Sequence, residues 1–330
     1  MILVPSLLKS SSAKRENMNK IVVFGANGFI GQHLVRALAA VPDNQILAFD
    51  KFADYQSDGE HQFMSLNNVQ VVAGNFFNRD EVADVLDDAS YVFHLISSTT
   101  PATSNNDPFI DVDTNVRSSV ELLQLCVDKG VRKVIFPSSG GTVYGDIDSN
   151  AIDENTVPAP RSPYGIGKLT IEHYLRYFNF TSGLEYIIYR IANPYGPGQN
   201  IYGKQGVIPI FMHRYLTKEP LTIFGDGTMV RDYIFIDDLI QMIVGSYDHD
   251  NNYPVYNLGS GTGETVNQIV DAIETCTGIA TERTSLPTPP TYIQKSVLSI
   301  ERFVNEFGIK PTTTIEDGIS RTWDYVKSLD

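Results

Sequence analysis

The sequence predicts an α/β fold built on a doubly wound parallel sheet, with a smaller α/β part at its C-terminal end. Short apolar runs rich in β-branched residues alternate with helical patterns up to residue 192. This alternation is typical of a parallel sheet that carries helices on both faces. The pattern becomes less regular from residue 193 onward. We therefore expect a first domain over 18–192, to which later segments at about 230–260 return, and a second domain mainly over 193–330.

The expected elements follow from apolar periodicity and from Gly and Pro positions. The strands of the first domain are expected at 21–24, 46–49, 69–74, 91–96, 133–136 and 186–190, and its helices at 29–40, 80–86, 111–129 and 163–180. Later helices are expected at 207–216, from Asp237 as a cap to 246, from 263, at 300–307 and at 315–328, with extended segments at 221–224, 232–236 and 255–258. Residues 1–17 turn from apolar to polar and are expected to be a disordered extension.

Three glycines follow the first expected strand at a spacing of three, namely Gly25, Gly28 and Gly31. They permit a tight turn, a close approach of the backbone to phosphate, and packing of the next helix on the strand. Asp50 ends the second strand nineteen positions after Gly31, where an acid binds ribose hydroxyls and repels the extra phosphate of NADP. The pattern predicts a Rossmann-type site for NAD. A purely structural glycine turn is the alternative.

Tyr164 and Lys168 lie four positions apart in an expected helix, so both side chains share one face. An unperturbed tyrosine has a pKa of about 10. A neighbouring ammonium and a positive nicotinamide ring would favour the phenolate. Such a tyrosine can take a proton from a sugar hydroxyl while hydride leaves the same carbon for NAD. We therefore expect Tyr164 and Lys168 to be catalytic; the alternative is a surface pair on an amphipathic helix.

The composition limits the classes of partner that the protein is expected to bind. The formal net charge is −14 and the sequence pI is about 4.8, which argues against nucleic acid and anionic membranes as partners. No apolar run approaches the length of a membrane span. Cys126 and Cys276 have no metal-type spacing, and we expect both to be buried free thiols. We expect no metal and a cytoplasmic location.

Five segments carry a resemblance to a known family, and they keep the family's order over nearly all of the chain after Met18. They are Gly25-x-x-Gly28-x-x-Gly31, Thr142-Val-Tyr-Gly145, Tyr164-x-x-x-Lys168, Asn193-Pro-Tyr-Gly-Pro-Gly-Gln199 and Gly225-Asp-Gly-x-x-x-Arg231-Asp-Tyr. The chain resembles the extended short-chain dehydrogenases/reductases of the NAD-dependent epimerase/dehydratase family, and most of all the UDP-glucose 4-epimerases. The resemblance implies removal of hydride from C4 of a nucleotide sugar, rotation of the 4-keto intermediate, and return of hydride to the opposite face by retained NAD.

The resemblance also implies the residues of the site. The catalytic group is expected to be Tyr164, Lys168, Ser139 and Thr142. The residues expected to bind NAD are Gly25, Asn27, Gly28, Phe29, Ile30, Gly31, Asp50, Asn75, Phe76 near the adenine, Leu95, Ser97, Asn115, Ser138, Tyr164 and Lys168. The residues expected to bind the UDP-sugar are Thr99, Tyr164, Asn193, Gln199, Arg231 and Ser296. For Arg231, which matches a diphosphate bidentately, the alternative is an ordinary salt bridge with Asp232.

The chain departs from the family at two points, in the loop after the fifth strand and downstream, where Pro289 and Tyr292 stand in place of an Arg and an Asp of related epimerases. The family usually has Ser or Thr four residues before the Val-Tyr-Gly tyrosine, to hydrogen-bond the reacting hydroxyl, and Gly140 stands there. Ser139, Thr142 or a water could donate instead, and we favour Ser139. Gly141 and Thr142 replace the Asp-Glu pair of sugar 4,6-dehydratases. Ser296 falls where a bulky tyrosine limits some relatives to unsubstituted hexoses, which would leave room for an N-acetyl group.

We therefore expect an NAD-dependent nucleotide-sugar 4-epimerase for UDP-glucose/UDP-galactose or UDP-GlcNAc/UDP-GalNAc, in a polysaccharide or glycoconjugate pathway. The alternatives are an NAD(P)H-dependent nucleotide 4-keto-sugar reductase or dehydratase, and, from another class, a non-catalytic nucleotide-binding regulator on the same fold. The helices at 111–129 and 163–180 resemble those that form a dimer interface in this family. A homodimer is therefore expected.

Overall fold

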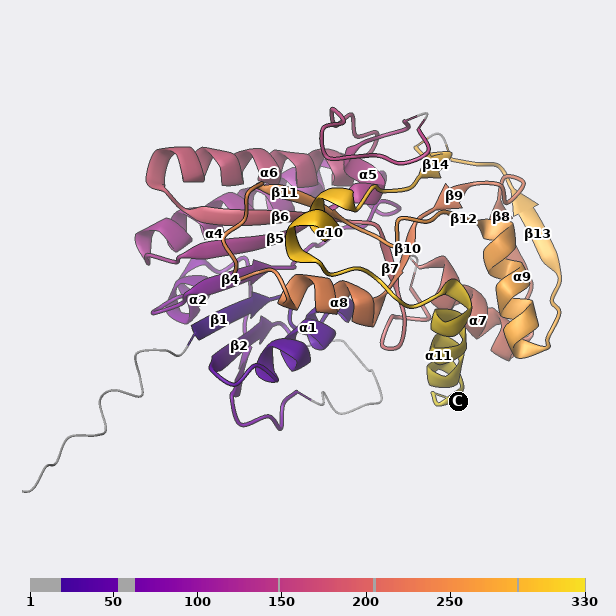
Figure 1. Cartoon of the computed structure of the whole chain (residues 1–330), viewed down its shortest axis with the longest axis horizontal. Helices are drawn as coiled ribbons and strands as arrows, with labels where there is room; N and C mark the ends of the chain where they lie inside the picture. Colours follow the sequence, from indigo (N-terminus) through magenta and orange to yellow (C-terminus); the bar gives the residue numbers. More distant parts are fainter. Residues whose placement is uncertain (1–18, 53–62, 148, 204–205, 290, 330) are drawn as a thin grey trace, which may run out of the picture.

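A parallel sheet of seven strands, in the order β11-β6-β5-β4-β1-β2-β3, is the largest feature of the computed structural model (Figure 1). The structure describes residues 19–52, 63–147, 149–203, 206–289 and 291–329, and the extension predicted at 1–17 lies outside them. The strands are β1 (Asn19–Phe24), β2 (Asn44–Asp50), β3 (Val69–Ala73), β4 (Tyr91–His94), β5 (Lys133–Ser139), β6 (Glu185–Ile191) and β11 (Val255–Leu258). The strand order reverses between β1 and β4, so the predicted doubly wound fold is confirmed.

Helices cover both faces of the sheet, which explains why its strands are apolar on both sides. In β1, Ile21 and Val23 join one buried cluster, while Val22 and Phe24 join a second cluster on the opposite face. The first cluster includes side chains of α1 (Phe29–Ala39) and α8 (Ile236–Val244). The second includes side chains of α2 (Arg79–Val85), α4 (Arg117–Asp128) and α6 (Pro163–Ser182).

The second part of the chain builds three small sheets beside the large one (Figure 1, right). Their strands are β7 (Asn193–Tyr195) with β10 (Tyr233–Phe235), then β12 (Glu264–Thr265), β9 (Val230–Arg231) and β14 (Lys295–Ser296), and β8 (Leu221–Phe224) with β13 (Arg283–Leu286). The helices of this part are α7 (Val207–Thr217), α9 (Val266–Thr277) and α11 (Ile315–Lys327). The chain returns to the large sheet twice, since α8 packs on α1 and α10 (Glu301–Phe307) packs on β11.

The long helix predicted over 111–129 differs from the structure. A short turn, α3 (Pro108–Ile110), leads into a π-helix, η1 (Asp111–Val116), and the α-helical part begins only at Arg117. Thr114 Oγ1 donates to the carbonyl of Ile110, and Ser119 Oγ to the carbonyl of Asn115. Such back-bonding side chains bend helices, and π-turns often occur at functional sites.

Several other expectations are corrected. Asp237 is not the cap of α8, which begins at Ile236 after an extended Phe235; the Asp237 carboxylate pairs instead with Arg321. Strand β5 continues through Pro137 to Ser139, because these residues pair with β6, and the turn after it, α5 (Gly140–Val143), was not predicted. Strands β7, β13 and β14 were not predicted either. Cys276 is exposed rather than buried.

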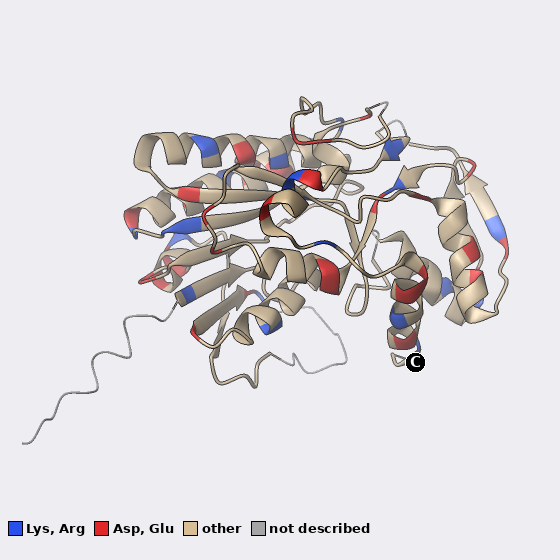
Figure 2. Ribbon diagram, viewed as in Figure 1, with Lys and Arg blue, Asp and Glu red and all other residues tan. Residues whose placement is uncertain are grey.

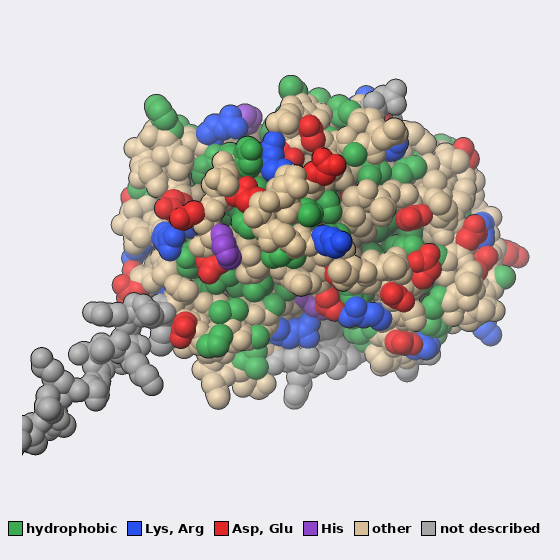
Figure 3. Space-filling model, in the orientation of Figure 1, with side chains coloured by type: hydrophobic (Ala, Val, Ile, Leu, Met, Phe, Trp, Pro, Cys, Tyr) green, Lys and Arg blue, Asp and Glu red, His purple; other side chains and the backbone are tan. Residues whose placement is uncertain are grey.

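The acidic residues are spread over both parts of the molecule. Figure 2 marks acidic residues on both parts of the ribbon, and on the face in Figure 3 hydrophobic, acidic and basic side chains are interspersed. No helix among the described residues is long and apolar enough to cross a bilayer.

Candidate active site

The glycine turn and Asp50 form a preorganised cradle at the carboxyl end of the sheet. Gly25 has φ +88°, a conformation that glycine adopts without strain. A Cβ atom at Gly31 would lie 2.1 Å from the Gly25 carbonyl oxygen, so α1 packs directly on the turn. Asp50 Oδ2 accepts from the Asn27 N–H at 2.9 Å and Oδ1 from the Lys51 N–H at 2.7 Å. Asn27 Oδ1 is buried without a hydrogen-bond partner in the described chain, which fits an acceptor kept for a ligand.

A cavity opens beyond the ends of strands β1 to β4, where an α/β sheet binds its ligand. Its lining includes six of the predicted cofactor residues, Gly25, Gly28, Asp50, Phe76, Leu95 and Ser97, and six others, Phe49, Lys51, Gly74, Phe77, Ile96 and Ser98. Phe29, Ile30 and Gly31 lie at the start of α1, just behind the turn. Asn75 Oδ1 accepts from the N–H of Phe77 at 3.2 Å. These residues fit a dinucleotide.

Phe76 was predicted to lie near the adenine, and the structure gives Phe76 and its neighbour Phe77 different surroundings. Phe76 is buried and stacks on the His94 ring, with centroids 5.3 Å apart. Phe77 is 41% exposed, and the Lys51 ammonium lies 5.4 Å from its ring centroid. Phe77 therefore presents the accessible aromatic face of the cavity. A second aromatic next to Phe76 was visible in the sequence, but nothing there distinguished the two.

Tyr164 and Lys168 share one face of α6, as their spacing predicts. The helix begins at Ser162, whose hydroxyl accepts from the Gly165 N–H at 3.2 Å. Lys168 Nζ donates to the carbonyl of Pro137 at 3.0 Å and lies 5.8 Å from the Tyr164 ring centroid. Burial lowers the pKa of Lys168 to about 8, although Glu172 and Asp111 raise it.

Tyr164 holds its proton in the ligand-free protein. Burial, together with the charge of Asp111, raises the pKa of Tyr164 to about 12. A base at neutral pH therefore needs an additional positive charge beside the phenol. The nicotinamide ring of bound NAD would supply such a charge.

In the loop between β5 and α6, position 140 has no side-chain hydroxyl, and the Leu298 side chain packs beside it instead. A Cβ atom at Gly140 would lie 2.5 Å from Leu298 Cδ1 and 3.0 Å from the Arg190 carbonyl oxygen. Leu298 therefore occupies the space of the usual side chain. Ser139 precedes α5 and makes no capping bond. Thr142 Oγ1 is buried without a partner in the described residues.

Thr142 also lines a second cavity. The other residues of this lining are Pro101, Arg161, Ser162, Thr291, Tyr292 and Ile293. Ser139 is absent from it. Of the two residues predicted as donors, Thr142 therefore lines this second cavity and Ser139 does not.

A buried ion pair between Arg190 and Glu172 contacts the end of β5, where the same loop begins. Arg190 Nη2 and Nε donate to the two oxygens of Glu172 at 2.6 and 3.1 Å. Glu172 Oε1 also accepts from Ser138 Oγ at 2.5 Å, so the predicted cofactor residue Ser138 directs its hydroxyl to this acid. The Arg190 guanidinium lies 4.8 Å from the Tyr144 ring centroid.

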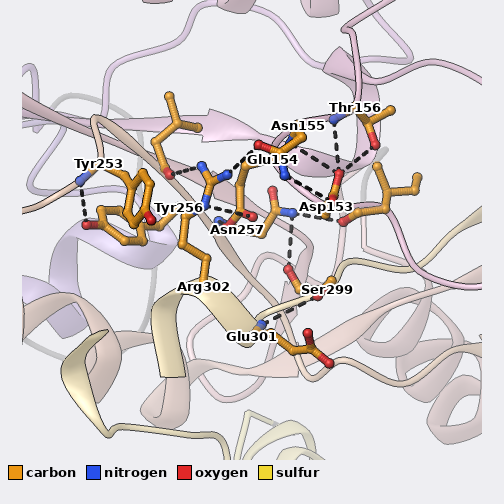
Figure 4. Close-up of polar contacts among 12 residues, drawn as sticks. Asp153, Glu154, Asn155, Thr156, Tyr253, Tyr256, Asn257, Ser299, Glu301 and Arg302 are labelled. Atoms are coloured by element: carbon orange, nitrogen blue, oxygen red, sulfur yellow. Dashed lines mark hydrogen bonds and ion pairs between the residues drawn. The ribbon is translucent and has the colours of Figure 1, made fainter. Parts of the chain in front are cut away.

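A network around Asn257 fixes the segment that carries Leu298 (Figure 4). Asn257 Oδ1 accepts from the Tyr144 hydroxyl at 2.7 Å, and its Nδ2 donates to the carbonyls of Ile152 and Ser299 at 2.9 and 3.2 Å. Glu154 accepts from the Asn257 N–H at 2.8 Å and pairs with Arg302 at 3.4 Å. The network joins the loop after β5, strand β11 and α10.

Arg231 is a half-buried guanidinium with no carboxylate in ion-pair range among the described residues. It donates to the carbonyls of Val230 and Gln294 at 2.8 and 3.5 Å, and burial lowers its pKa. Asp232 points elsewhere, accepting from Ser260 Oγ at 2.8 Å and from the Leu298 N–H at 3.2 Å. The alternative of an Arg231–Asp232 salt bridge is therefore wrong. Arg231 is free to meet an anion.

The other predicted substrate residues are spread around this region. Asn193 Nδ2 donates to the carbonyl of Asp232 at 2.8 Å, and its amide lies 3.9 Å from a Cβ atom placed on Gly141. Ser296 is buried on β14, in register with Arg231 on β9. Gln199 Nε2 donates to the Pro194 carbonyl at 3.3 Å, while its Oε1 is buried without a partner in the described chain.

Asn115 and Thr99 join the cofactor cavity to α6. Asn115 Oδ1 accepts from the Ser98 N–H at 2.8 Å, and its Nδ2 donates to Thr99 Oγ1 at 2.9 Å and to Asp111 Oδ1 at 2.8 Å. Thr99 Oγ1 donates to the same Asp111 oxygen at 2.7 Å. Asp111 is a residue that the sequence analysis missed. In the sequence, Asp111 could have been found as an acid four positions before Asn115, which was itself predicted to bind NAD.

His94 has no acid–base part in this arrangement. Burial lowers its pKa to about 3, so the ring is neutral, and Nε2 bonds Ser119 Oγ at 2.7 Å. Among the described residues no group of three His, Cys, Asp or Glu side chains could hold a metal ion.

The fold and this site define a class: a dinucleotide-dependent oxidoreductase scaffold with a tyrosine and a lysine on one face of α6. Comparison with known proteins gives the family. Residues 21–259 match the model of the NAD dependent epimerase/dehydratase family, and the chain belongs to that family. The predicted fold, the NAD dependence and the class of enzyme, an isomerase of the short-chain dehydrogenase/reductase type, are thereby confirmed.

Three relatives are informative. A putative UDP-glucose 4-epimerase of Methanocaldococcus jannaschii is 30% identical over 93% of this chain and 98% of its own length. A dTDP-4-dehydro-6-deoxyglucose reductase of Escherichia coli is 31% identical over 92% of this chain and 96% of its own. The solved structure of the Thermotoga maritima UDP-glucose 4-epimerase with UDP-glucose has a TM-score of 0.87 and 33% identity, and covers 94% of this chain and 99% of that one.

Proposed function

We propose that this protein is a nucleotide-sugar 4-epimerase that acts on a UDP-hexose and retains NAD. The observation that carries the proposal is the Tyr164–Lys168 face of α6, which Asp111 and Asn115 join to Ser98 in the dinucleotide cavity. The guanidinium of Arg231, which makes no ion pair among the described residues, lies in the second part of the chain. Two of the relatives described above have UDP-glucose 4-epimerase in their names. The two-domain division at residue 192 belongs to this proposal, with NAD bound by the first domain and the sugar mainly by the second.

Each residue has a separate role in the proposed reaction. Tyr164 takes the proton of the C4 hydroxyl and later returns it to the same oxygen. The ammonium of Lys168 stabilises the phenolate that Tyr164 forms. When bound, NAD would take up the hydride and, in its reduced form, give it back. Arg231 holds the diphosphate while the sugar turns, because a guanidinium matches phosphate oxygens bidentately.

Thr142, rather than Ser139, is proposed to hydrogen-bond the reacting hydroxyl. Its hydroxyl is buried and unpartnered within the described residues, and the residue lines the second cavity together with Ser162, the cap of α6. We expect Thr142→Val to lower kcat by about 10²-fold, the magnitude typical of losing one positioned donor. Ser139→Ala serves as the matched control and should lower kcat much less. The reverse order would contradict the assignment.

The substrate proposal includes UDP-N-acetylglucosamine as well as UDP-glucose, because Ser296 is small where a bulky residue would exclude a C2 substituent. The purified protein is incubated with each sugar and no added cofactor, and products are resolved by proton NMR. Formation of the C4 epimer, abolished by Tyr164→Phe with NAD still bound, supports the epimerase. Activity on a 4-keto sugar only, with added NAD(P)H, would establish the reductase that the Escherichia coli relative suggests.

We also propose a homodimer in which η1, α4 and α6 pack against a second copy. Five large apolar side chains of these helices are exposed: Val112 (59%), Ile166 (53%), Tyr174 (37%), Tyr177 (54%) and Phe180 (89%). Burying such side chains favours association. Sedimentation velocity should give twice the mass of one chain, and Tyr177→Glu should give a monomer. Val157→Glu, at a more exposed apolar position in a loop, should leave the dimer intact.

A further inference from the structure

Asp111 is a buried acid at the start of η1 that the proposed reaction has not used. Its side chain is 2% exposed. Oδ1 accepts from Thr99 Oγ1 and Asn115 Nδ2, while Oδ2 is buried without a hydrogen-bond partner in the described residues. An uncompensated buried carboxylate oxygen is costly. Such exceptions require an explanation and gather at functional sites.

The carboxylate of Asp111 lies against the turn of α6 that carries the proton-transfer pair. A Cβ atom placed on Gly167, between Tyr164 and Lys168, would be 3.6 Å from Asp111 Oδ1. No cation is within ion-pair distance of Asp111 in the part of the chain that the structure describes. Its negative charge therefore acts mainly on the neighbouring phenol and ammonium.

The other ionisable groups near this turn are already neutralised. Glu172, one turn beyond Lys168 on α6, is paired with Arg190 on β6 and also accepts from Ser138 on β5. His94 on β4 is uncharged, because burial lowers its pKa to about 3. Among the described residues, Asp111 is thus the acid on this face that makes no ion pair, and the nearby ammonium of Lys168 is the cation whose pKa it raises.

We propose that Asp111 is a positioning residue of the reaction: one oxygen fixes Thr99 and Asn115, and the charge makes Tyr164 hold its proton more tightly. The inference rests on the proposed role of Tyr164 in proton transfer. Both pKa directions agree with it, since Asp111 raises the pKa of Tyr164 and that of Lys168. A phenolate of higher pKa is the stronger base. The carboxylate thereby favours transfer of the C4 hydroxyl proton to Tyr164 in the oxidation step.

The test is the titration of Tyr164 in the NAD-loaded protein, which needs no turnover. Tyrosines are labelled with carbon-13 at Cζ, and the Tyr164 signal is assigned by its absence in Tyr164→Phe. We expect Asp111→Asn, which keeps the shape and removes the charge, to lower the pH of the Tyr164 titration by about one unit. Asp111→Glu should stay near the wild type. Asp113→Asn, an exposed acid of the same helix, is the matched control and should not shift it.

The outcomes separate this inference from the proposed function. An unchanged titration in folded Asp111→Asn would overturn the inference, even if the wild type forms the C4 epimer. A shifted titration in a protein that makes no epimer would support the role of Asp111 and refute the epimerase. If Asp111→Asn does not fold, the smaller neutral Asp111→Ser replaces it, with the same shift expected. A loss of activity without any shift would indicate a purely structural role and would also overturn the proposal.

Discussion

Leu298 and Gly140 are predicted to be energetically coupled, and Gly140→Ser is the perturbation that exposes the coupling. The new Cβ atom would lie 2.5 Å from Leu298 Cδ1, against an optimum of roughly 3.5–4.0 Å between carbon atoms. The Leu298 side chain must therefore retreat by about 1 Å. It is fully buried in a cluster with Val143, Tyr144 and Ile152. Overpacking of this kind costs about 1–3 kcal/mol.

The assay is a double-mutant cycle on the free energy of unfolding in urea, measured at constant NAD concentration. We expect Gly140→Ser to lower this free energy by about 2 kcal/mol and Leu298→Ala by about 3 kcal/mol. The double variant should lose about 1–2 kcal/mol less than the sum, because the atoms that meet the new Cβ are gone.

Gly141→Ser is the matched control for this cycle. A Cβ atom at Gly141 would meet only the Asn193 amide, at 3.9 Å, which is an ordinary contact. Strictly additive effects, or a Gly140→Ser variant no less stable than Gly141→Ser, would refute the reasoning.

Three further predictions concern charge. Because the pKa of Lys168 is about 8, its ammonium is lost as the pH rises through 8, and kcat should fall there. Lys168→Arg should be slower but keep its activity to higher pH. An unchanged alkaline limb in the pH profile of kcat of this variant would contradict the role of Lys168. Glu172→Gln leaves Arg190 buried without its counter-charge and should cost about 3–5 kcal/mol of stability in urea unfolding, whereas a loss below about 1 kcal/mol would mean that water reaches the pair. Asp50→Ala should weaken NAD binding to the cofactor-stripped protein and reduce its preference over NADP, measured by calorimetry with both nucleotides; an unchanged preference would show that another group selects the cofactor.

The elements set by local patterns were predictable from the sequence. The run from Ile21 to Gly31 contains the strand, the turn and the helix start, and all three form as predicted. The four-residue spacing of Tyr164 and Lys168 places both on one face of α6, because helix geometry depends only on the local chain.

Features that depend on distant partners were not predictable. Leu298 fills the space beside Gly140 only because the network around Asn257 brings the two segments together. The π-helix at Asp111 has no sequence period of its own, since it results from competing side-chain bonds and from packing on α6. The accessible face of Phe77 depends on how the turn after β3 is folded.

The path of the chain between the two parts has a consequence for folding. Strand β11 completes the edge of the large sheet, yet it is synthesised after β7 to β10 and α7 of the other part. A chain that ended at residue 192 would leave the edge of β6 unpaired, and such an edge invites association with other chains. The cofactor part therefore cannot close its sheet before β7 to β10 and α7 of its neighbour have been made, and we expect the two parts to unfold in a single cooperative transition rather than one after the other.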